Sequence, residues 1–226
     1  MNDVADIQYG RYRDRRHAGT ALARSLSEYA GRGDLAVLAL PRGGVPVADE
    51  VARALGAPLD IFVVRKLGVP GHEELAMGAI ASGDVRVLND DAISWYGIPP
   101  SVVDRVAGNE QAELERRERV YREGRALIPV EDRVVILVDD GLATGATMHA
   151  AVLAARKLRP RRVVVAVPVG AADTCQALRR VADDVVCPMI PDNFSAVGLW
   201  YHDFSQTTDE EVRDILGAGH GTGDRR

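Results

Sequence analysis

The chain has 226 residues, of which 46% are hydrophobic and 27% charged, and its formal net charge is −5 at pH 7. This length suits a single α/β domain with a small appendage. The negative net charge excludes a general electrostatic attraction to nucleic acid or to anionic lipid, so we expect neither as a partner, and a site for an anion has to be built locally.

The sequence also predicts a cytoplasmic protein. No apolar run reaches the roughly 20 residues that a membrane-spanning helix needs. Residues 1–16 are rich in charge and lack the apolar core of a signal peptide. The two cysteines, Cys175 and Cys187, have no metal-type spacing, which predicts free thiols in a reducing compartment.

Hydrophobic spacing predicts alternating helices and strands in the first half of the chain. Apolar residues at helical spacing predict a helix within residues 17–30, and a short apolar run predicts a buried strand at residues 34–40. Residues 43–56 are predicted as a turn and helix that follow this strand, and residues 59–66 are predicted as the second strand. Two apolar pieces around residues 82–84 then predict a β-hairpin.

The second half of the chain alternates in the same way. Residues 101–125 are predicted as a charged helix whose Glu and Arg side chains pair at i,i+4 on a solvated face. The alternation indicates an α/β fold with a doubly wound, mainly parallel sheet, in which ligands bind beyond the carboxyl ends of the strands. We expect a single domain over residues 15–216, with flexible residues 1–14 and 217–226. The remaining predicted elements are strands at 134–138, 162–167 and 183–190 and helices at 146–158 and 171–180.

Residues 133–147, RVVILVDDGLATGAT, combine two features that bind ligand groups of opposite charge. A buried strand delivers two adjacent carboxylates, Asp139 and Asp140, to its carboxyl end. The loop after them contains Gly145 and two threonine hydroxyls, and the next helix begins there, so free amide groups can bind a phosphate. The loop is not a Walker loop, which argues against a nucleoside triphosphatase. A phosphorylated ribose satisfies both features, since carboxylates bind sugar hydroxyls or a hydrated Mg²⁺.

Two other segments supply groups that bind anions. In PRGGVP, Gly43 and Gly44 expose amides and Arg42 adds a forked donor. The alternative for this segment is a simple strand-to-helix turn. Arg65 and Lys66 end the predicted second strand with two cations, for which the alternative is a solvated strand end.

The segment VVILVDDGLATGAT resembles the motif with which type I phosphoribosyltransferases bind 5-phosphoribosyl pyrophosphate (PRPP). From about residue 15 to residue 216 the chain is also similar to uncharacterised bacterial phosphoribosyltransferase-like proteins, which share phrases similar to RKLGVPGHEELAMGAIA and WYHDFSQTTDEEV. The resemblance implies the type I phosphoribosyltransferase fold, with a β-hairpin lid and a small C-terminal hood at about residues 188–207. It also implies a homodimer.

The activity that the resemblance implies is that of a pentosyltransferase. Such an enzyme moves 5-phosphoribose from PRPP to a nitrogenous base, with Mg²⁺ as cofactor, and releases pyrophosphate, as in purine or pyrimidine salvage. The alternative is a non-catalytic regulatory protein that senses PRPP or a nucleotide. The hypoxanthine-guanine branch has an aspartate immediately before T-G-x-T, where this chain has Ala143, so a 6-oxopurine acceptor loses support.

The resemblance also implies roles for individual residues. Asp139 and Asp140 are expected to act in catalysis, to hold the ribose and to contact Mg²⁺ through water. The residues expected to bind the 5-phosphate and ribose are Asp139, Asp140, Gly141, Leu142, Ala143, Thr144, Gly145, Ala146 and Thr147, and those expected to bind pyrophosphate are Arg42, Gly43, Gly44, Arg65 and Lys66.

The lid and the hood contain the remaining candidates. The lid, from residue 67 to about residue 80, has the glycines and prolines of a mobile loop and carries Glu73 and Glu74 as catalytic candidates. A surface helix start is the alternative for these glutamates. The hood concentrates aromatic rings that can stack on an acceptor base, and the alternative is a local core that packs the C-terminus onto the sheet. These rings are Phe194, Trp200 and Tyr201.

Overall fold

The computed structural model describes residues 10–219 and is built around a five-stranded sheet of order β2-β1-β6-β7-β8. Its neighbouring strands are parallel, which confirms the predicted sheet. Strand order reverses between β1 and β6, so the carboxyl ends of these two strands frame the point where such sheets bind ligands. The strands are β1 (Leu35–Ala39), β2 (Leu59–Ile61), β6 (Val134–Val138), β7 (Arg162–Ala166) and β8 (Asp184–Val186).

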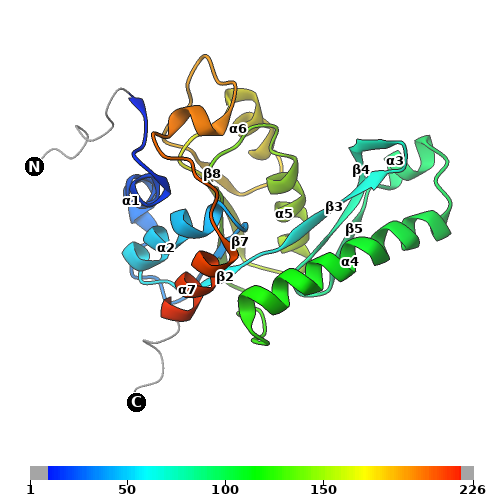
Figure 1. Cartoon of the computed structure of the whole chain (residues 1–226), viewed down its shortest axis with the longest axis horizontal. Coiled ribbons are helices and arrows are strands. Elements are labelled where there is room, and N and C mark those ends of the chain that lie inside the picture. The colour runs from blue at the N-terminus through cyan, green and yellow to red at the C-terminus, as the bar shows by residue number, and fades with distance from the viewer. Residues whose placement is uncertain (1–9, 220–226) are drawn as a thin grey trace, which may run out of the picture.

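Helices cover both faces of this sheet (Figure 1). Because side chains alternate along a strand, Val37 and Ala39 of β1 enter one apolar cluster, while Ala36 and Leu38 enter the other. Within the described range, no helix is both long and apolar enough to cross a bilayer. The first cluster includes side chains of α1 (Arg15–Ser25), α2 (Gly44–Leu55), α4 (Pro100–Arg122) and α7 (Asp209–Gly219), and the second includes those of α5 (Ala146–Lys157) and α6 (Ala172–Leu178).

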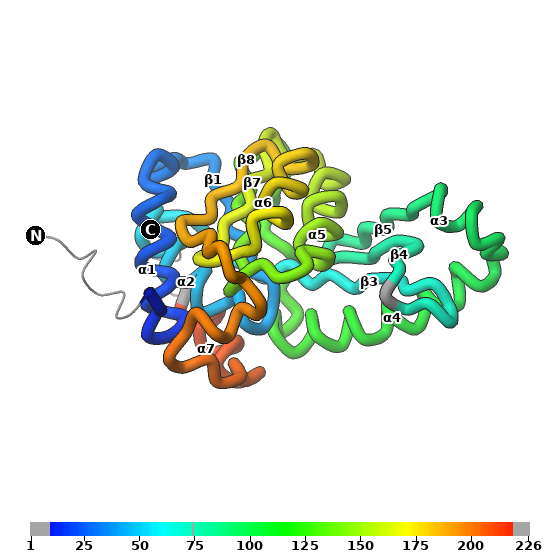
Figure 2. Tube along the Cα trace, turned by 90° about the horizontal axis from the view of Figure 1, so that it is seen from above, coloured from blue at the N-terminus to red at the C-terminus, as the bar shows by residue number. Residues whose placement is uncertain are grey.

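A second sheet, antiparallel and of order β3-β4-β5, projects from the body of the molecule as an arm (Figures 1 and 2). The turn between β4 and β5, with positive φ at Gly83 and Asp84, confirms the predicted hairpin. The predicted mobile loop is wrong in its local structure, because residues 67–80 form the paired strands β3 and β4, with a register shift at residues 67–69 and a tight turn at residues 70–71. We define the arm as residues 64–122, which contain β3 (Val64–Val69), β4 (His72–Ala81), β5 (Val85–Leu88), α3 (Asp90–Trp95) and α4.

The prediction of one strand at residues 59–66 is also wrong. Phe62 and Val63 separate β2 of the parallel sheet from β3 of the arm. The Phe62 amide donates to the carbonyl of Ala39 at 2.8 Å, and the Val63 amide donates to Ser82 Oγ at 3.0 Å. The continuous apolar run does not reveal that the chain passes from one sheet to the other, since the residues on either side of Phe62 and Val63 are apolar in both sheets.

The packed part of the chain extends beyond the predicted limits of residues 15–216. Tyr12 is 1% exposed and forms a β-bridge with Tyr201. At the other end, α7 continues to Gly219. The predicted flexibility of residues 1–9 and 220–226 falls outside the described residues.

Helix α7 was missed in the sequence, although its start has a readable signal. Thr208 Oγ1 accepts a hydrogen bond from the Glu211 amide at 3.1 Å, and three acidic residues occupy the first turn. A threonine followed by acidic residues is typical of a helix N-terminus. Two short 3-10 helices, η3 (Ser27–Tyr29) and η4 (Val197–Trp200), were also missed.

A buried arginine joins the arm to the body. The Arg122 side chain pairs with Glu118, as predicted, but not on a solvated face, because Arg122 is 5% exposed. Its Nε donates to Asp60 Oδ1 at 2.9 Å, and its Nη2 donates to the carbonyl of Ile61 at 2.6 Å and to Ser82 Oγ at 3.3 Å. The guanidinium therefore links α4 to β2 and to the β4–β5 turn.

We predict that Arg122→Met lowers the free energy of unfolding by about 3–5 kcal/mol, because Asp60 keeps a buried carboxylate without its cation. Arg119→Met, at an exposed position one turn earlier on α4, should change it by less than about 0.5 kcal/mol. Urea unfolding followed by circular dichroism measures both values. Similar values for the two variants would contradict the anchoring role.

Candidate active site

The candidate site lies where β1 and β6 end side by side, with Ala39 opposite Val138 in register. The loop after β1 carries three of the five predicted pyrophosphate residues, Arg42, Gly43 and Gly44, and the loop after β6 carries the acidic pair. The Leu40 amide donates to the carbonyl of Val138 at 2.8 Å, and the Gly44 amide donates to the carbonyl of Leu40 at 3.1 Å. The structure thus brings together two segments that are about 95 residues apart in the chain by simple parallel pairing.

Two glycines allow these loops to touch. A Cβ atom on Gly43 would lie 2.0 Å from Asp140 Oδ2, and one on Gly44 would lie 2.6 Å from the carbonyl oxygen of Val138 and 2.9 Å from Asp139 Cα. The sequence suggested that these glycines expose amides to an anion. The close approach of Gly43 and Gly44 to the acidic pair is a second reason for glycine at these positions, because it leaves no room for a side chain.

The acidic pair is largely buried, and Arg15 is its cationic neighbour among the described residues. Asp140 Oδ2 accepts from Arg15 Nε at 2.8 Å, and Asp139 Oδ1 accepts from the Asp140 amide at 2.8 Å. Burial raises the pKa of Asp139 well above its usual range, and the charge of Asp140 raises it further. Burial also raises the pKa of Asp140, while Arg15 acts against this rise. A pair with raised pKa values favours a ligand that donates hydrogen bonds or carries positive charge.

The loop at residues 141–147 is fixed by hydrogen bonds to residues near β7 and α6. The Leu142 amide donates to the carbonyl of Val169 at 2.9 Å, and Thr174 Oγ1 donates to the carbonyl of Ala143 at 2.6 Å. Leu142 is 2% exposed, so its side chain is a packing group and only its backbone is available to a ligand.

The start of α5 is open to an anion. Gly145 is the N-cap residue with φ +70°, and no side chain in the described part of the chain caps this helix. Thr144 and Thr147 are exposed. Since the amides of a first helical turn have no intrahelical acceptor, they can bind a phosphate.

The predicted cations lie in three different settings. Arg42 Nη1 is 3.3 Å from Asp209 Oδ1, at the start of α7. Arg65 and Lys66 are consecutive in β3 and therefore point to opposite faces. Arg65 pairs with Glu110 of α4 at 2.6 Å, whereas Lys66 faces α5.

A cavity of about 650 Å³ separates the body from the arm. Lys66 and Gly78 line its arm side, and Thr144, Gly145 and Ala146 line its body side. Of the five predicted pyrophosphate residues, only Lys66 borders this space. The structure thus places Lys66 and the predicted phosphate loop at one cavity, and Arg42 beside Asp209 at the start of α7.

The lid glutamates are not brought to the acidic pair. Glu73 is exposed beside the β3–β4 turn, and its Oε1 accepts from the Gly71 amide at 3.1 Å. This turn lies at the outer end of the arm, away from the central sheet (Figure 1). The side chain of Glu74 lies outside the described residues. Catalytic roles for Glu73 and Glu74 therefore stay predictions.

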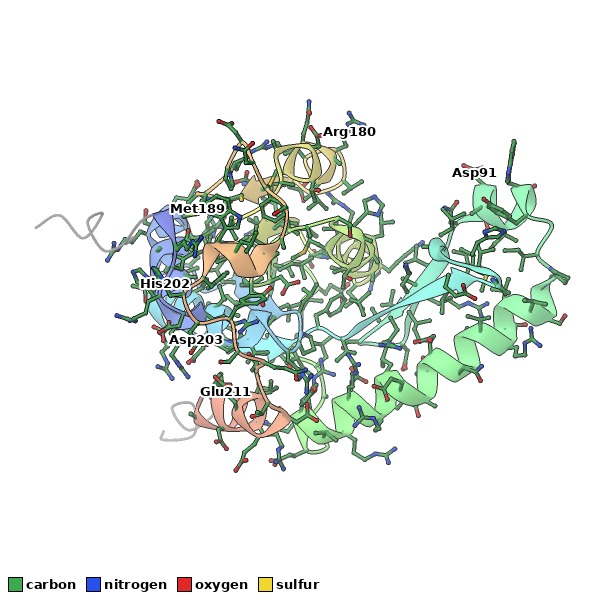
Figure 3. All side chains as sticks on the ribbon, turned by 45° about the horizontal axis from the view of Figure 1, so that its top comes forward. Asp91, Arg180, Met189, His202, Asp203 and Glu211 are labelled. Atoms are coloured by element: carbon green, nitrogen blue, oxygen red, sulfur yellow. The ribbon has the colours of Figure 1, made fainter. Side chains whose placement is uncertain are left out.

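The hood packs along the start of the chain. The amides of His202 and Asp203 donate to the carbonyls of Tyr12 and Arg13, and Figure 3 shows both labelled residues on a segment that runs beside α1. Tyr201 is 3% exposed, its ring packs against Tyr12, and its hydroxyl donates to the backbone carbonyl of Asp140 at 2.6 Å.

This packing bears on one of the acceptor predictions. Because the Tyr201 ring is 3% exposed and packs against Tyr12, the structure favours the local-core alternative for that side chain, and its acceptor role stays a prediction. Phe194 and Trp200 are half-buried at the edge of the same cluster and stay predictions. Phe204 is 37% exposed, and Arg15 lies over its ring at 4.0 Å.

Sequence reasoning missed Arg15, although it is the cation that contacts the acidic pair. Its segment, RYRDRRH, contains four arginines, and nothing local distinguishes this one from its neighbours. The contact depends on how α1 docks beside the end of β6, which is a tertiary property.

Comparisons with known proteins agree with this geometry. A family model described as phosphoribosyl transferase domain matches residues 8–205. The protein Rv0571c of Mycobacterium tuberculosis strain H37Rv, provisionally named a phosphoribosyl transferase, is 48% identical over 207 residues, which cover 92% of this chain and 46% of that protein. The chain therefore spans about half the length of this curated relative.

Two further comparisons concern a solved structure and a shorter match. The crystal structure of TT1426 from Thermus thermophilus is 46% identical with a TM-score of 0.84, over 91% of this chain and 97% of that chain. Bifunctional protein PyrR of Clostridium acetobutylicum is 32% identical over 139 residues, which cover 61% of this chain and 58% of that protein. The match to TT1426 supports the fold over both the body and the arm.

We predict that Gly44→Ala lowers the free energy of unfolding by about 1–3 kcal/mol, because the new methyl group overlaps backbone atoms of Val138 and Asp139. Gly108→Ala on α4 is the matched control. Apart from the adjoining backbone of α4 itself, no atom of the described chain lies within 4 Å of its Cβ position, so helix propensity should raise stability by about 0.5–1 kcal/mol. Chemical denaturation of both variants measures the difference, and equal effects would argue against the close approach.

Proposed function

Because the chain belongs to the phosphoribosyl transferase domain family, we propose that it transfers 5-phosphoribose from PRPP to a nitrogenous base and releases pyrophosphate. The observation that carries this proposal is the meeting of the acidic pair, the Gly43–Gly44 loop and the open start of α5 at one switch point. These three features match the three parts of PRPP: ribose hydroxyls, pyrophosphate and 5-phosphate. We further propose that the activity belongs to cytoplasmic salvage of purines or pyrimidines and that the protein acts as a homodimer.

The 5-phosphate binds in the loop of residues 141–147. Amides of the first turn of α5 and the hydroxyls of Thr144 and Thr147 donate to its oxygens. The helix dipole contributes about 0.3–1 kcal/mol, and charge-assisted hydrogen bonds contribute roughly 1.5–3 kcal/mol each. No lysine is needed within the loop itself.

The ribose lies over Asp139 and Asp140, which accept hydrogen bonds from its hydroxyls. The bond between C1 and the pyrophosphate oxygen breaks as a bond from the acceptor nitrogen to C1 forms, and the sugar passes through an oxocarbenium-like state. Two carboxylates fixed beside the ring stabilise this positive charge. Most of the rate enhancement then comes from position and electrostatics.

Pyrophosphate binds through the amides of Gly43 and Gly44 and through nearby cations. Arg42 exchanges its contact with Asp209 for the ligand, and Lys66 approaches from the arm. Arg65 keeps its ion pair with Glu110 and acts on the ligand only through the position of β3.

Magnesium fits this site as a partner of the substrate rather than of the protein alone. In the described range, no group of three or more metal-binding side chains is present, and Asp140 already accepts from Arg15. Mg²⁺ commonly binds through one or two carboxylates plus substrate phosphates and keeps several waters. Asp139 and Asp140 would hold the ion through water, and it would supply positive charge beside the leaving pyrophosphate.

The acceptor base lies under the hood. Phe194, Trp200 and the partly exposed Phe204 offer apolar surface there, and Ala143 removes the aspartate of the hypoxanthine-guanine branch. We therefore favour an acceptor other than a 6-oxopurine.

The test is pyrophosphate release from PRPP with Mg²⁺ and a panel of free bases. We expect release that depends on one base, with a loss of about 100-fold or more in Asp139→Asn/Asp140→Asn, because two charged acceptors are removed. Asp104→Asn/Asp132→Asn removes the same charge from exposed positions and should retain activity. PRPP binding without release for any base would favour the regulatory alternative, and no PRPP binding would refute the proposal.

A second prediction separates the two consecutive cations of β3. Lys66→Met should raise the dissociation constant for PRPP about 10-fold, since a cation beside the phosphate loop is lost. Arg65→Met should leave it within about 3-fold, because that side chain is already paired with Glu110. Isothermal titration calorimetry compares them, and the reverse order would contradict the assignment.

A further inference from the structure

Arg15, the first residue of α1, contacts three parts of the candidate site through one guanidinium group. Its Nε donates to Asp140 Oδ2 at 2.8 Å, and its Nη1 donates to the carbonyl of Ser205 at 2.6 Å. The guanidinium carbon lies 4.0 Å from the centre of the Phe204 ring. The Arg15 side chain is only 11% exposed. Its hydrogen bond to Asp140 is partly buried, whereas its hydrogen bond to the Ser205 carbonyl lies at the surface.

Asp140 is attached to the hood a second time. Its backbone carbonyl accepts from the Tyr201 hydroxyl at 2.6 Å, and the Tyr201 and Phe204 rings lie 5.0 Å apart. Arg15 therefore completes a closed set of contacts that runs from Asp140 to Tyr201, to Phe204, to Arg15 and back to Asp140.

We propose that Arg15 is a positioning residue that couples the hood to the acidic pair. It fixes the Asp140 carboxylate for the ribose hydroxyls and ties that orientation to the segment that covers the acceptor. This inference rests on the proposed function, because it assumes that Asp140 holds the ribose of PRPP.

The chemistry of these contacts requires arginine. A guanidinium can donate from Nε in one direction and from Nη1 in another while its flat face stacks on an aromatic ring. A lysine ammonium keeps the charge, but it cannot keep the two separated donors and the stacking at once. Arg15→Lys should therefore rescue only part of the loss caused by Arg15→Gln.

The neighbouring arginine provides a matched control. Arg16 lies on the same helix, and its Nη1 donates to Asp49 at 2.9 Å and to Glu50 at 3.1 Å, on α2. Arg16 also forms ion pairs, although its side chain is more exposed than that of Arg15, and its partners belong to α2 rather than to the acidic pair or the hood. Arg16→Gln removes the same group from the same helix without touching Asp140.

The experiment is calorimetric titration of PRPP in the presence of Mg²⁺ into the whole protein and its variants. We expect Arg15→Gln to weaken binding about 10–100-fold, Arg15→Lys to weaken it less, and Arg16→Gln to leave it within about 3-fold. Hydrogen exchange of residues 196–206 provides a second readout. PRPP should slow this exchange in the wild type and in Arg16→Gln, but not in Arg15→Gln.

A double-mutant cycle tests whether Arg15 acts through Asp140. In an Asp140→Asn background, Arg15→Gln should weaken PRPP binding by less than about 3-fold, since the carboxylate that it positions is already gone. Additive losses would mean that Arg15 contacts the ligand directly, which overturns the positioning role. Unchanged binding in Arg15→Gln also overturns it.

The outcomes separate this inference from the proposed function. If the wild type does not bind PRPP, the proposed function fails and the inference fails with it. If the wild type binds PRPP and Arg15→Gln binds equally well, only the inference fails. Should Arg15→Gln not fold, Arg15→Lys with its partial loss still decides between the outcomes.

Discussion

The close contact between the loop after β1 and the loop after β6 is the constraint on which the site depends. Parallel pairing of β1 with β6 sets the two loops side by side, and Gly43 and Gly44 let them approach to a distance that no side chain would permit. The anion-binding amides and the acidic pair consequently occupy one small region. Neither loop alone would form a site for a ligand that carries both phosphates and sugar hydroxyls.

Two adjacent carboxylates at this place are costly unless nearby groups offset their charge. Burial raises the pKa of both Asp139 and Asp140, and Arg15 is the cation that offsets part of this effect. The starts of α2 and α5 also lie at this edge of the sheet, and their amides favour negative charge. The same helix starts that can bind phosphates therefore help to stabilise the carboxylates, so the acidic pair and the phosphate loop do not oppose each other.

The features that the sequence predicted well are those with a local signal. A short apolar run before Pro41 marked β1, a run of β-branched residues before Asp139 marked β6, and the T-G-x-T loop marked the start of α5. The change of sheet at Phe62 and Val63 has no such signal, because both strands are apolar and continuous in sequence. The role of Arg15 was invisible for a similar reason, since it depends on how α1 docks against the end of β6.

The aromatic residues of the hood illustrate the same limit, because a cluster of rings serves equally well as a stacking surface or as a core. The structure uses Tyr201 as a core residue and leaves Phe204 partly exposed, with Arg15 over its ring.

The alternation of side chains along β3 has a mechanical consequence for the arm. Arg65 is paired with Glu110, so β3 and α4 form one unit, and Arg122 anchors α4 to β2 and to the β4–β5 turn. Lys66 faces the opposite way, across the cavity from the phosphate loop. The Lys66 backbone is part of the unit that β3 and α4 form. The distance of the Lys66 ammonium from a bound phosphate is therefore set by the position of the whole arm and by the flexible Lys66 side chain. The buried network around Arg122 thus contributes to the geometry of the site through β3.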